Sequence, residues 1–175
     1  MMQRIYTFAR DQSGAAAIEF AFVLPIMLTL CLGMFEAAGL VSANMKVGNA
    51  AQLLGDLVAQ QTNETNSLTS NFCAGAQIAL TPLSPSSLKA DIVSVTHYSA
   101  GISVDWQDTT CGGAATISNG ASLASSLIPN VGDSVIIVVA TYNYASPVSY
   151  VLKSSYSLGQ TTYSRPRNVP NITHS

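Results

Sequence analysis

The feature of this sequence that most strongly indicates a functional site is an acidic residue near the start of a long apolar segment. Glu19 is the only charged residue between Gly14 and Phe35. A carboxylate at the bilayer centre costs about 2.5–3.5 kcal/mol on insertion scales, and the next turns of the segment offer Glu19 no Lys or Arg. A cut between Gly14 and Ala15 would create an α-ammonium group about one helical turn before Glu19. That group could pair with its own Glu19 or, in a bundle of parallel subunits, with Glu19 of a neighbour, which would fix the register between helices.

A second interpretation of the same pattern needs no proteolysis. Glu19 would then lie at the headgroup end of an ordinary signal anchor, and its carboxylate would reach water. The spacing alone leaves both interpretations open.

Two of the three cysteines lie in the polar part of the chain. Cys73 and Cys111 are 38 positions apart, and Cys31 lies within the apolar segment. If the polar part faces an oxidising compartment, Cys73 and Cys111 are expected to form a disulfide. Such a bridge would stabilise the fold by about 3–4 kcal/mol. The alternative is a pair of buried free thiols.

Other residues that could act in catalysis or metal binding are sparse. His97 and His174 are the only histidines, and no Cys, His or acidic cluster has the spacing of metal ligands. Asp105 and Asp108 lie on either side of Trp106 and could bind calcium or act as acid and base, but two acids at a strand end are more often a solvated turn. No nucleophile elbow and no phosphate-binding glycine loop occurs. We therefore expect no enzyme, metal or cofactor, and a net charge of −2 offers no basic surface for nucleic acid.

The element that must position Glu19 is a membrane-spanning helix. The run from Ala15 to Phe35 has 21 residues, which at about 1.5 Å each gives about 32 Å, one hydrocarbon thickness. Arg4 and Arg10 precede it, whereas Lys46 is the only basic residue for a long distance beyond it. This bias predicts a cytoplasmic N-terminus and an exported C-terminal part.

The helix is predicted to continue well beyond the membrane. Apolar residues recur near helical spacing at Leu40, Val47, Leu54 and Val58, with polar residues between them. The pattern therefore predicts one helix from about residue 15 to about residue 60, hydrophobic all round in its first half and amphipathic in its second.

The remainder of the sequence predicts a small α+β domain with a mainly antiparallel sheet. Residues 62–71 are polar and are expected to form a linker or turn, and residues 120–129 a short helix. Alternating or continuous apolar runs predict the strands, at residues 91–99, 102–107, 134–144 and 149–164. The 135–139 run is apolar throughout and is expected to be buried on both faces.

The N-terminal residues resemble a known family. The stretch DQSGAAAIEFAFVLPIMLTL, and GAAAIEF within it, is similar to the processing signature of TadE-like proteins (TadE and TadG) of the tight-adherence (Tad) type IV pilus system. The closing stretches VIIVVATYNYASP and TTYSRPR resemble that family more weakly. The resemblance implies a type IV pilin-like fold and a cut by a prepilin peptidase between Gly14 and Ala15, with Glu19 fifth and Phe20 sixth in the mature chain.

The resemblance also implies a division of the chain and a role. It implies a cytoplasmic leader (1–14), a transmembrane helix (15–36), its amphipathic continuation (37–61), a periplasmic α+β domain (62–168) and a tail (169–175). The protein would be a minor pilin or pseudopilin in the bacterial inner membrane, and its partners would be the prepilin peptidase, the major Flp-type pilin, other minor pilins and membrane lipid. The residues expected to pack against other helices are apolar: Phe20, Val23, Leu24, Ile26 and Leu28.

The alternative function is an unprocessed, signal-anchored periplasmic binding module. It would hold a peptide or glycan on a surface of Trp106 and tyrosines, namely Tyr142, Tyr144, Tyr150, Tyr156 and Tyr163. Aromatic residues at strand spacing are more often core and cross-strand pairs.

Overall fold

The computed structural model describes residues 13–147 and 154–175. The chain divides into two units, one ending at Gly39 and the other comprising Leu40–Ser175. Helix α2 (Ser13–Val58) belongs to both, and each unit is described separately below.

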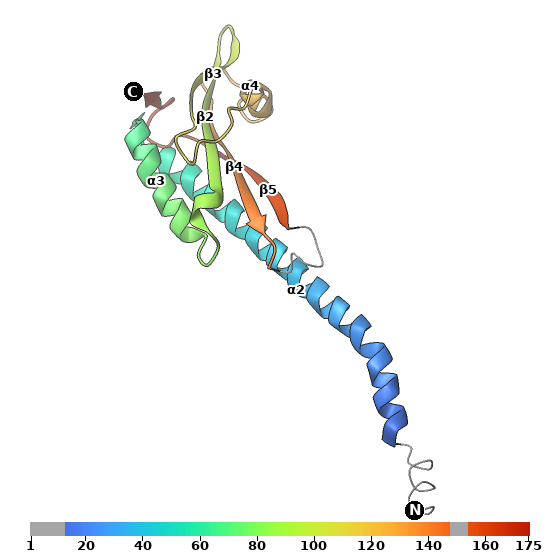
Figure 1. Ribbon diagram of the computed structural model, residues 1–175. Helices are drawn as coiled ribbons and strands as arrows, with labels where there is room; N and C mark the ends of the chain where they lie inside the picture. The colour runs from blue at the N-terminus through green and yellow to red at the C-terminus, as the bar shows by residue number, and fades with distance from the viewer. Residues whose placement is uncertain (1–12, 148–153) are drawn as a thin grey trace, which may run out of the picture. The chain divides into compact units, whose positions relative to one another are not determined.

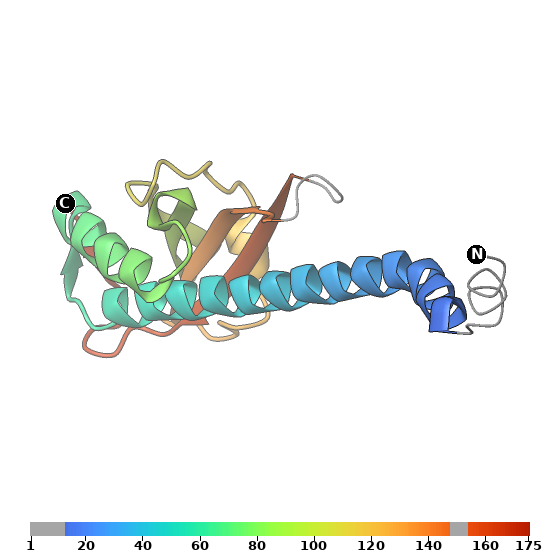
Figure 2. The ribbon, with the colours of Figure 1, turned by 60° about the horizontal axis from the view of Figure 1, so that its bottom comes forward.

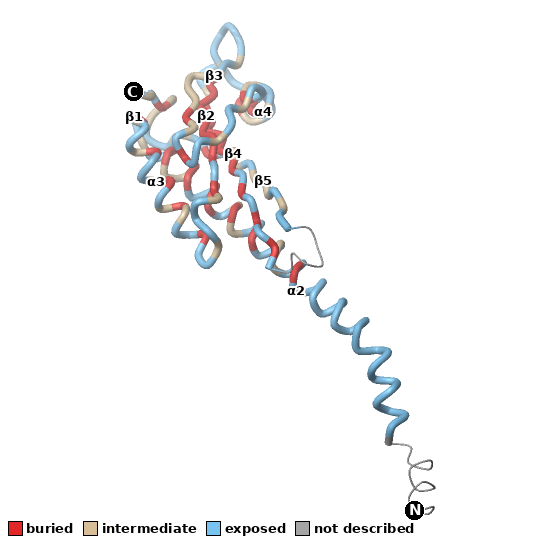
Figure 3. The backbone as a smooth tube through the Cα atoms, in the orientation of Figure 1, coloured by how far each residue is buried: buried red, intermediate tan, exposed pale blue. Residues whose placement is uncertain are grey.

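In the first unit, α2 is an uninterrupted apolar helix. Every residue from 14 to 35 is exposed, as the pale tube in Figure 3 shows. Pro25 lies inside the helix, and the Thr29 hydroxyl donates a hydrogen bond of 2.8 Å to the Pro25 carbonyl oxygen. Among the described residues, α2 is the one helix that is long and apolar enough to cross a membrane. In water, the apolar side chains of residues 14–35 would stay exposed without any packing partner. The segment is therefore compatible with single-pass membrane anchoring.

The second unit is an antiparallel sheet with helices against it (Figure 1). The strand order is β3-β2-β4-β5, and all three pairings are antiparallel. The strands are β2 (Leu88–Tyr98), β3 (Gly101–Asp108), β4 (Ser134–Ala145) and β5 (Ser155–Ser164). The remaining elements are α3 (Asn66–Ala79), the 3-10 turn η1 (Pro85–Ser87), α4 (Gly120–Ala124), and a parallel pair formed by β1 (Asn63–Glu64) and β6 (Thr173–His174).

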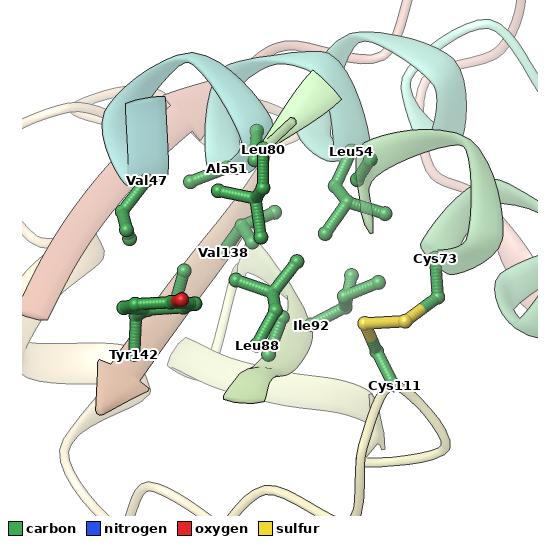
Figure 4. Packing of buried hydrophobic residues seen from close by; sticks show 14 of the residues in the cluster. Val47, Ala51, Leu54, Cys73, Leu80, Leu88, Ile92, Cys111, Val138 and Tyr142 are labelled. Atoms are coloured by element: carbon green, nitrogen blue, oxygen red, sulfur yellow. A yellow bond between two sulfur atoms is a disulfide. The ribbon is translucent and has the colours of Figure 1, made fainter. Parts of the chain in front are cut away.

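The main core lies between the helices and one face of the sheet. The second half of α2 follows this face (Figure 2) and buries residues that recur every three or four positions. Figure 4 shows several of them, with Val47 and Leu54 of α2 facing Leu88 and Val138 of the sheet. The packing is close enough that a Cβ on Gly55 would lie 2.9 Å from the Ser164 hydroxyl oxygen.

A second, smaller core lies on the other face of the sheet, beneath α4. Its members are Val93, Val95, Ala124, Ile128, Val135 and Ile137. Because Ile136 and Val138 belong to the main core, the apolar run of β4 is buried on both faces, as its sequence predicts.

The predicted α+β class and the long N-terminal helix are confirmed, and two local expectations are corrected. Residues 62–71, expected as a linker or turn, instead contain β1 and the beginning of α3. The Thr65 hydroxyl caps α3 by accepting a hydrogen bond of 3.2 Å from the Leu68 amide. The helix expected over 120–129 is shorter, since α4 ends at Ala124. The first residues of the strand expected over 149–164 lie outside the described residues.

A disulfide joins α3 to the loop after β3. Cys73 and Cys111 are both buried, and their Cα atoms are 5.4 Å apart. The bridge closes one end of the main core (Figure 4). Gly112 follows it with φ +71°, and a Cβ at this position would meet the carbonyl oxygen of Leu88, so only glycine fits without strain.

Candidate functional site

The proposed processing residues lie in the first turns of α2. Among the described residues the helix runs from Ser13, and Gly14, Ala15, Glu19 and Phe20 are all exposed. A Cβ built on Gly14 meets no other atom within 4 Å, so nothing in the described structure encloses the peptide bond that would be cut. The backbone is helical from Ala15 to Glu19, which puts the two residues about one turn apart on one side of the helix.

The predicted packing residues of the first unit are exposed but do not form one narrow stripe. Their exposed fractions run from 38% to 63% for Phe20, Val23, Leu24, Ile26 and Leu28. At 3.6 residues per turn, these five positions cover about 200° of the helix circumference. Such a helix presents apolar surface on most of its sides, so it is suited to contact lipid and several neighbouring helices at once.

In the second unit, the two aspartates flanking Trp106 do not form an acid pair. Asp105 accepts hydrogen bonds from hydroxyl groups of β2, including Thr96 at 2.5 Å and Tyr98 at 2.8 Å. Asp108 is buried, and its Oδ1 accepts a hydrogen bond of 2.7 Å from the Thr110 amide. The calcium or acid–base role considered for the two together therefore has no support in their arrangement.

Asp108 belongs to a separate polar cluster that the sequence gives no reason to expect. Its Oδ2 lies 3.4 Å from Nε2 of His174 on β6. Glu64 of β1 is also buried, and it accepts a hydrogen bond of 2.9 Å from the Thr69 hydroxyl. The cluster connects both strands of the small parallel pair to β3 and α3.

The environment moves the pKa values of the two carboxyl groups in opposite directions. Burial is the main cause that raises the pKa of Glu64, and the nearby Asp108 charge adds to it, whereas the Thr69 hydroxyl acts in the opposite sense. Burial also acts to raise the pKa of Asp108, but hydrogen bonds from Thr110, Thr69 and His174 together outweigh it, so that pKa is lowered.

Aromatic side chains are divided between the core and the surface. Tyr142 and Tyr144 are buried in the main core, as expected for aromatic residues at strand spacing. The Trp106 indole nitrogen donates a hydrogen bond of 2.6 Å to the Ile172 carbonyl oxygen, and its ring centroid lies 5.1 Å from that of His174. Tyr150 lies outside the described residues. The burial of Tyr142 and Tyr144 removes these two residues from an adhesive surface.

The described part of the chain contains no group of three or more His, Cys, Asp or Glu residues that could hold a metal ion. His97 instead fixes a loop, since its Nδ1 lies 2.8 Å from the Ile128 carbonyl oxygen. Within residues 13–147 and 154–175, neither histidine forms a hydrogen bond to a serine or cysteine side chain: His97 contacts Ile128, and His174 contacts Asp108.

Comparison with known proteins finds one similarity, in the N-terminal part of the chain. Residues 14–53 match the family model described as TadE-like protein. No curated protein and no solved structure matches the chain. The matched stretch begins at Gly14 and covers the exposed apolar part of α2 and most of its buried continuation. Over residues 14–53 the chain is therefore similar to TadE-like proteins.

Proposed function

We propose that this TadE-like protein is a membrane-anchored minor pilin or pseudopilin that takes part in assembling a Tad-type pilus. The observation that carries the proposal is the family match over residues 14–53, which falls on one continuous helix. The first part of that helix is apolar and fully exposed within its unit. A helix with this surface needs lipid or other apolar helices around it.

Processing is the first step of the proposed role. A prepilin peptidase of the inner membrane would cut between Gly14 and Ala15, which removes fourteen residues. Among the described residues no atom lies within 4 Å of a Cβ built on Gly14, which supports this because a protease needs an accessible backbone. The new ammonium group on Ala15 would then pair with Glu19, either of the same chain or of a neighbouring pilin.

The proposed orientation places the second unit in the periplasm. Arg4 and Arg10 precede the apolar segment, and positive charge favours the cytoplasmic side. The disulfide between Cys73 and Cys111 supports export of the second unit, because disulfides persist in oxidising compartments. The apolar helix would then contact the major Flp-type pilin, other minor pilins and membrane lipid.

Processing is tested by expressing the full chain with and without the prepilin peptidase of its own host and measuring the intact mass. We expect the loss of the first fourteen residues with peptidase and no loss without it. Gly14→Val should block the cut, because the cleavage pattern of the family requires glycine there.

Gly33→Val is the matched control for this experiment. Gly33 lies in the same helix, and a Cβ there also meets no atom within 4 Å, so the control makes the same change in an equally open position. It should be cut as the native chain is. An intact N-terminus in cells that produce pili would contradict the proposal and would favour an unprocessed, signal-anchored binding module.

A further inference from the structure

Strand β3 carries one extra residue opposite β2, and that residue is Asp105. Ser94 pairs with Trp106 and Val95 pairs with Val104, so Asp105 has no opposite partner. A bulge of this kind interrupts the ordinary alternation of side chains and aims the extra residue differently, and bulges occur preferentially next to functional sites.

Three hydroxyl groups hold the Asp105 carboxylate in place. Oδ2 accepts hydrogen bonds from Ser94 at 3.3 Å and from Thr96 at 2.5 Å, and Oδ1 accepts one from Tyr98 at 2.8 Å. The three donors alternate along β2 and therefore share one face of the strand. Donation by three hydroxyls fixes the position of the carboxylate and leaves one lone pair of Oδ1 for a further donor.

No cation in the described part of the chain neutralises this carboxylate. The two ion pairs there join other groups, Arg167 with Asp56 and His174 with Asp108. The hydrogen bond to Asp105 and then the charge of Asp105 raise the pKa of Tyr98. A fixed, partly buried and unpaired negative charge is unfavourable until a cation meets it.

A cavity of about 250 Å³ opens at this carboxylate. Its walls are Asp105, the rings of Tyr98 and Trp106, and the C-terminal segment 171–174. Tyr98 is 41% exposed, so its ring is available to a cation, and contact of a cation with an aromatic ring is favourable. A neighbouring hollow of about 310 Å³ shares Tyr98 and Asn171 with this cavity, so that together they offer room for a side chain and part of its backbone.

We propose that this pocket binds a lysine or arginine side chain of a partner protein. The cationic group would donate a hydrogen bond to Oδ1 of Asp105 and lie against the ring of Tyr98. A bound calcium ion fits less well, because calcium takes six to eight oxygen ligands and the hydroxyls here already donate to the only carboxylate. The site lies wholly in the second unit and does not depend on processing of the N-terminus.

The test uses the full chain in detergent micelles and two peptides that differ in charge. Trp106 is the only tryptophan of the protein and lines the pocket, so tryptophan emission reports on its occupancy. The probe is acetyl-Gly-Arg-Gly-amide, and its neutral counterpart carries citrulline instead of arginine. We expect a saturable change in emission with the arginine peptide, weakened by added salt, and none with the citrulline peptide.

The variants test which carboxylate is responsible. Asp105→Asn keeps the shape of the side chain but removes its charge, and it should weaken binding at least about tenfold, since hydrogen bonds to charged groups are the stronger class. Asp56→Asn makes the same change at an acid that does not line the pocket, and it should leave binding unchanged.

Three results would overturn the proposal: equal binding of the citrulline peptide, a response to calcium chloride without one to the arginine peptide, or no saturable response at all. The comparison of peptides uses the native chain, so it decides the question even if Asp105→Asn does not fold. It also leaves the proposed pilus role untouched, because that role is tested by the mass of the processed chain.

Discussion

At the scale of single residues, Glu64 is a buried acid that resists ionisation in the folded protein. One oxygen accepts a hydrogen bond from Thr69, and the other has no hydrogen-bond partner. Burial therefore raises its pKa above the ordinary value of 4.5. Asp91 on β2 is buried as well, and burial likewise raises its pKa, against the hydrogen bonds from Gln107 and Ile117. Both groups bind protons more tightly in the folded state than in the unfolded chain.

This difference fixes the sign of a pH dependence. A carboxyl whose pKa is higher in the folded state contributes stability at low pH, and that contribution is lost as the pH rises through its folded pKa. The pKa of Asp108 is instead lowered below 3.8. Its contribution to the free energy of unfolding is therefore present at higher pH and is lost only as the pH falls through that lowered pKa. The free energy of unfolding should therefore fall as the pH rises above about 4.5.

Glu64→Gln tests this assignment. Glutamine keeps the acceptor for Thr69 but cannot ionise, so the variant should be more stable than the native protein at neutral pH. Its free energy of unfolding should also decline less between pH 4.5 and pH 7, although the Asp91 contribution remains. Chemical denaturation across this pH range measures both effects, and Asp133→Asn, which removes an acid outside this cluster, is the control. Identical pH profiles for Glu64→Gln and the native protein would show that Glu64 does not carry the effect.

At the scale of elements, the disulfide compensates for the weak packing surface of α3. This helix buries only Thr69, Cys73 and Ala76, all of which are small. Phe72 is the one large apolar residue of α3 that packs against the main core, and it is only partly buried. Small side chains remove little apolar area from water, so contacts alone hold the helix weakly. The bridge from Cys73 to Cys111 attaches it to the loop after β3.

Loss of the bridge should therefore be costly. Cys73→Ser combined with Cys111→Ser opens a loop of 38 positions, and we expect the free energy of unfolding to fall by about 3–4 kcal/mol. Cys31→Ser is the control, because Cys31 is the exposed free cysteine of the first unit. Denaturation of the two variants, and of the native chain with reducing agent, gives the comparison. A double variant as stable as the control would mean that α3 is held by its contacts alone.

Some elements of the fold can be predicted from the sequence, whereas α3, the β1–β6 pair and the bulge in β3 cannot. Helix α2 and strand β4 are visible in the sequence because large apolar residues recur with a clear period. Helix α3 has no such signal, since its buried positions include a threonine and an alanine. The pairing of β1 with β6 involves two residues from each strand, and such short strands form only because the fold brings them together. The bulge at Asp105 is a property of the register between β2 and β3, which neither strand encodes alone, so the pocket could not be predicted either.

At the scale of the whole molecule, the two units differ in what stabilises them. The first presents an apolar helix without a core of its own, and the second has its core beneath and above one sheet. The second unit is therefore stabilised by its own core. The apolar side chains of the first unit can be buried only by lipid or by neighbouring helices. Assembly should then depend on the first unit, and insertion of the chain into the membrane on its overall hydrophobicity.

Glu19→Ala separates insertion from assembly. Removing a charge from an apolar segment lowers the cost of insertion, so the variant should reach the membrane fraction in normal amount. It should also lose residues 1–14, because the glycine of the cleavage pattern is unchanged. In the proposed pairing, loss of the carboxylate leaves the ammonium group on Ala15 without a partner in the apolar layer, and the register between neighbouring helices is no longer fixed. We therefore expect cells carrying the variant to contain the processed protein but few or no pili, scored by electron microscopy.

Thr29→Ala is the matched control. Thr29 is a polar residue of the same helix, and its hydroxyl donates a hydrogen bond to the Pro25 carbonyl oxygen of that helix. This variant should support normal pili. Normal piliation by Glu19→Ala would show that the charge pair is dispensable and that apolar contacts alone bring the helices together.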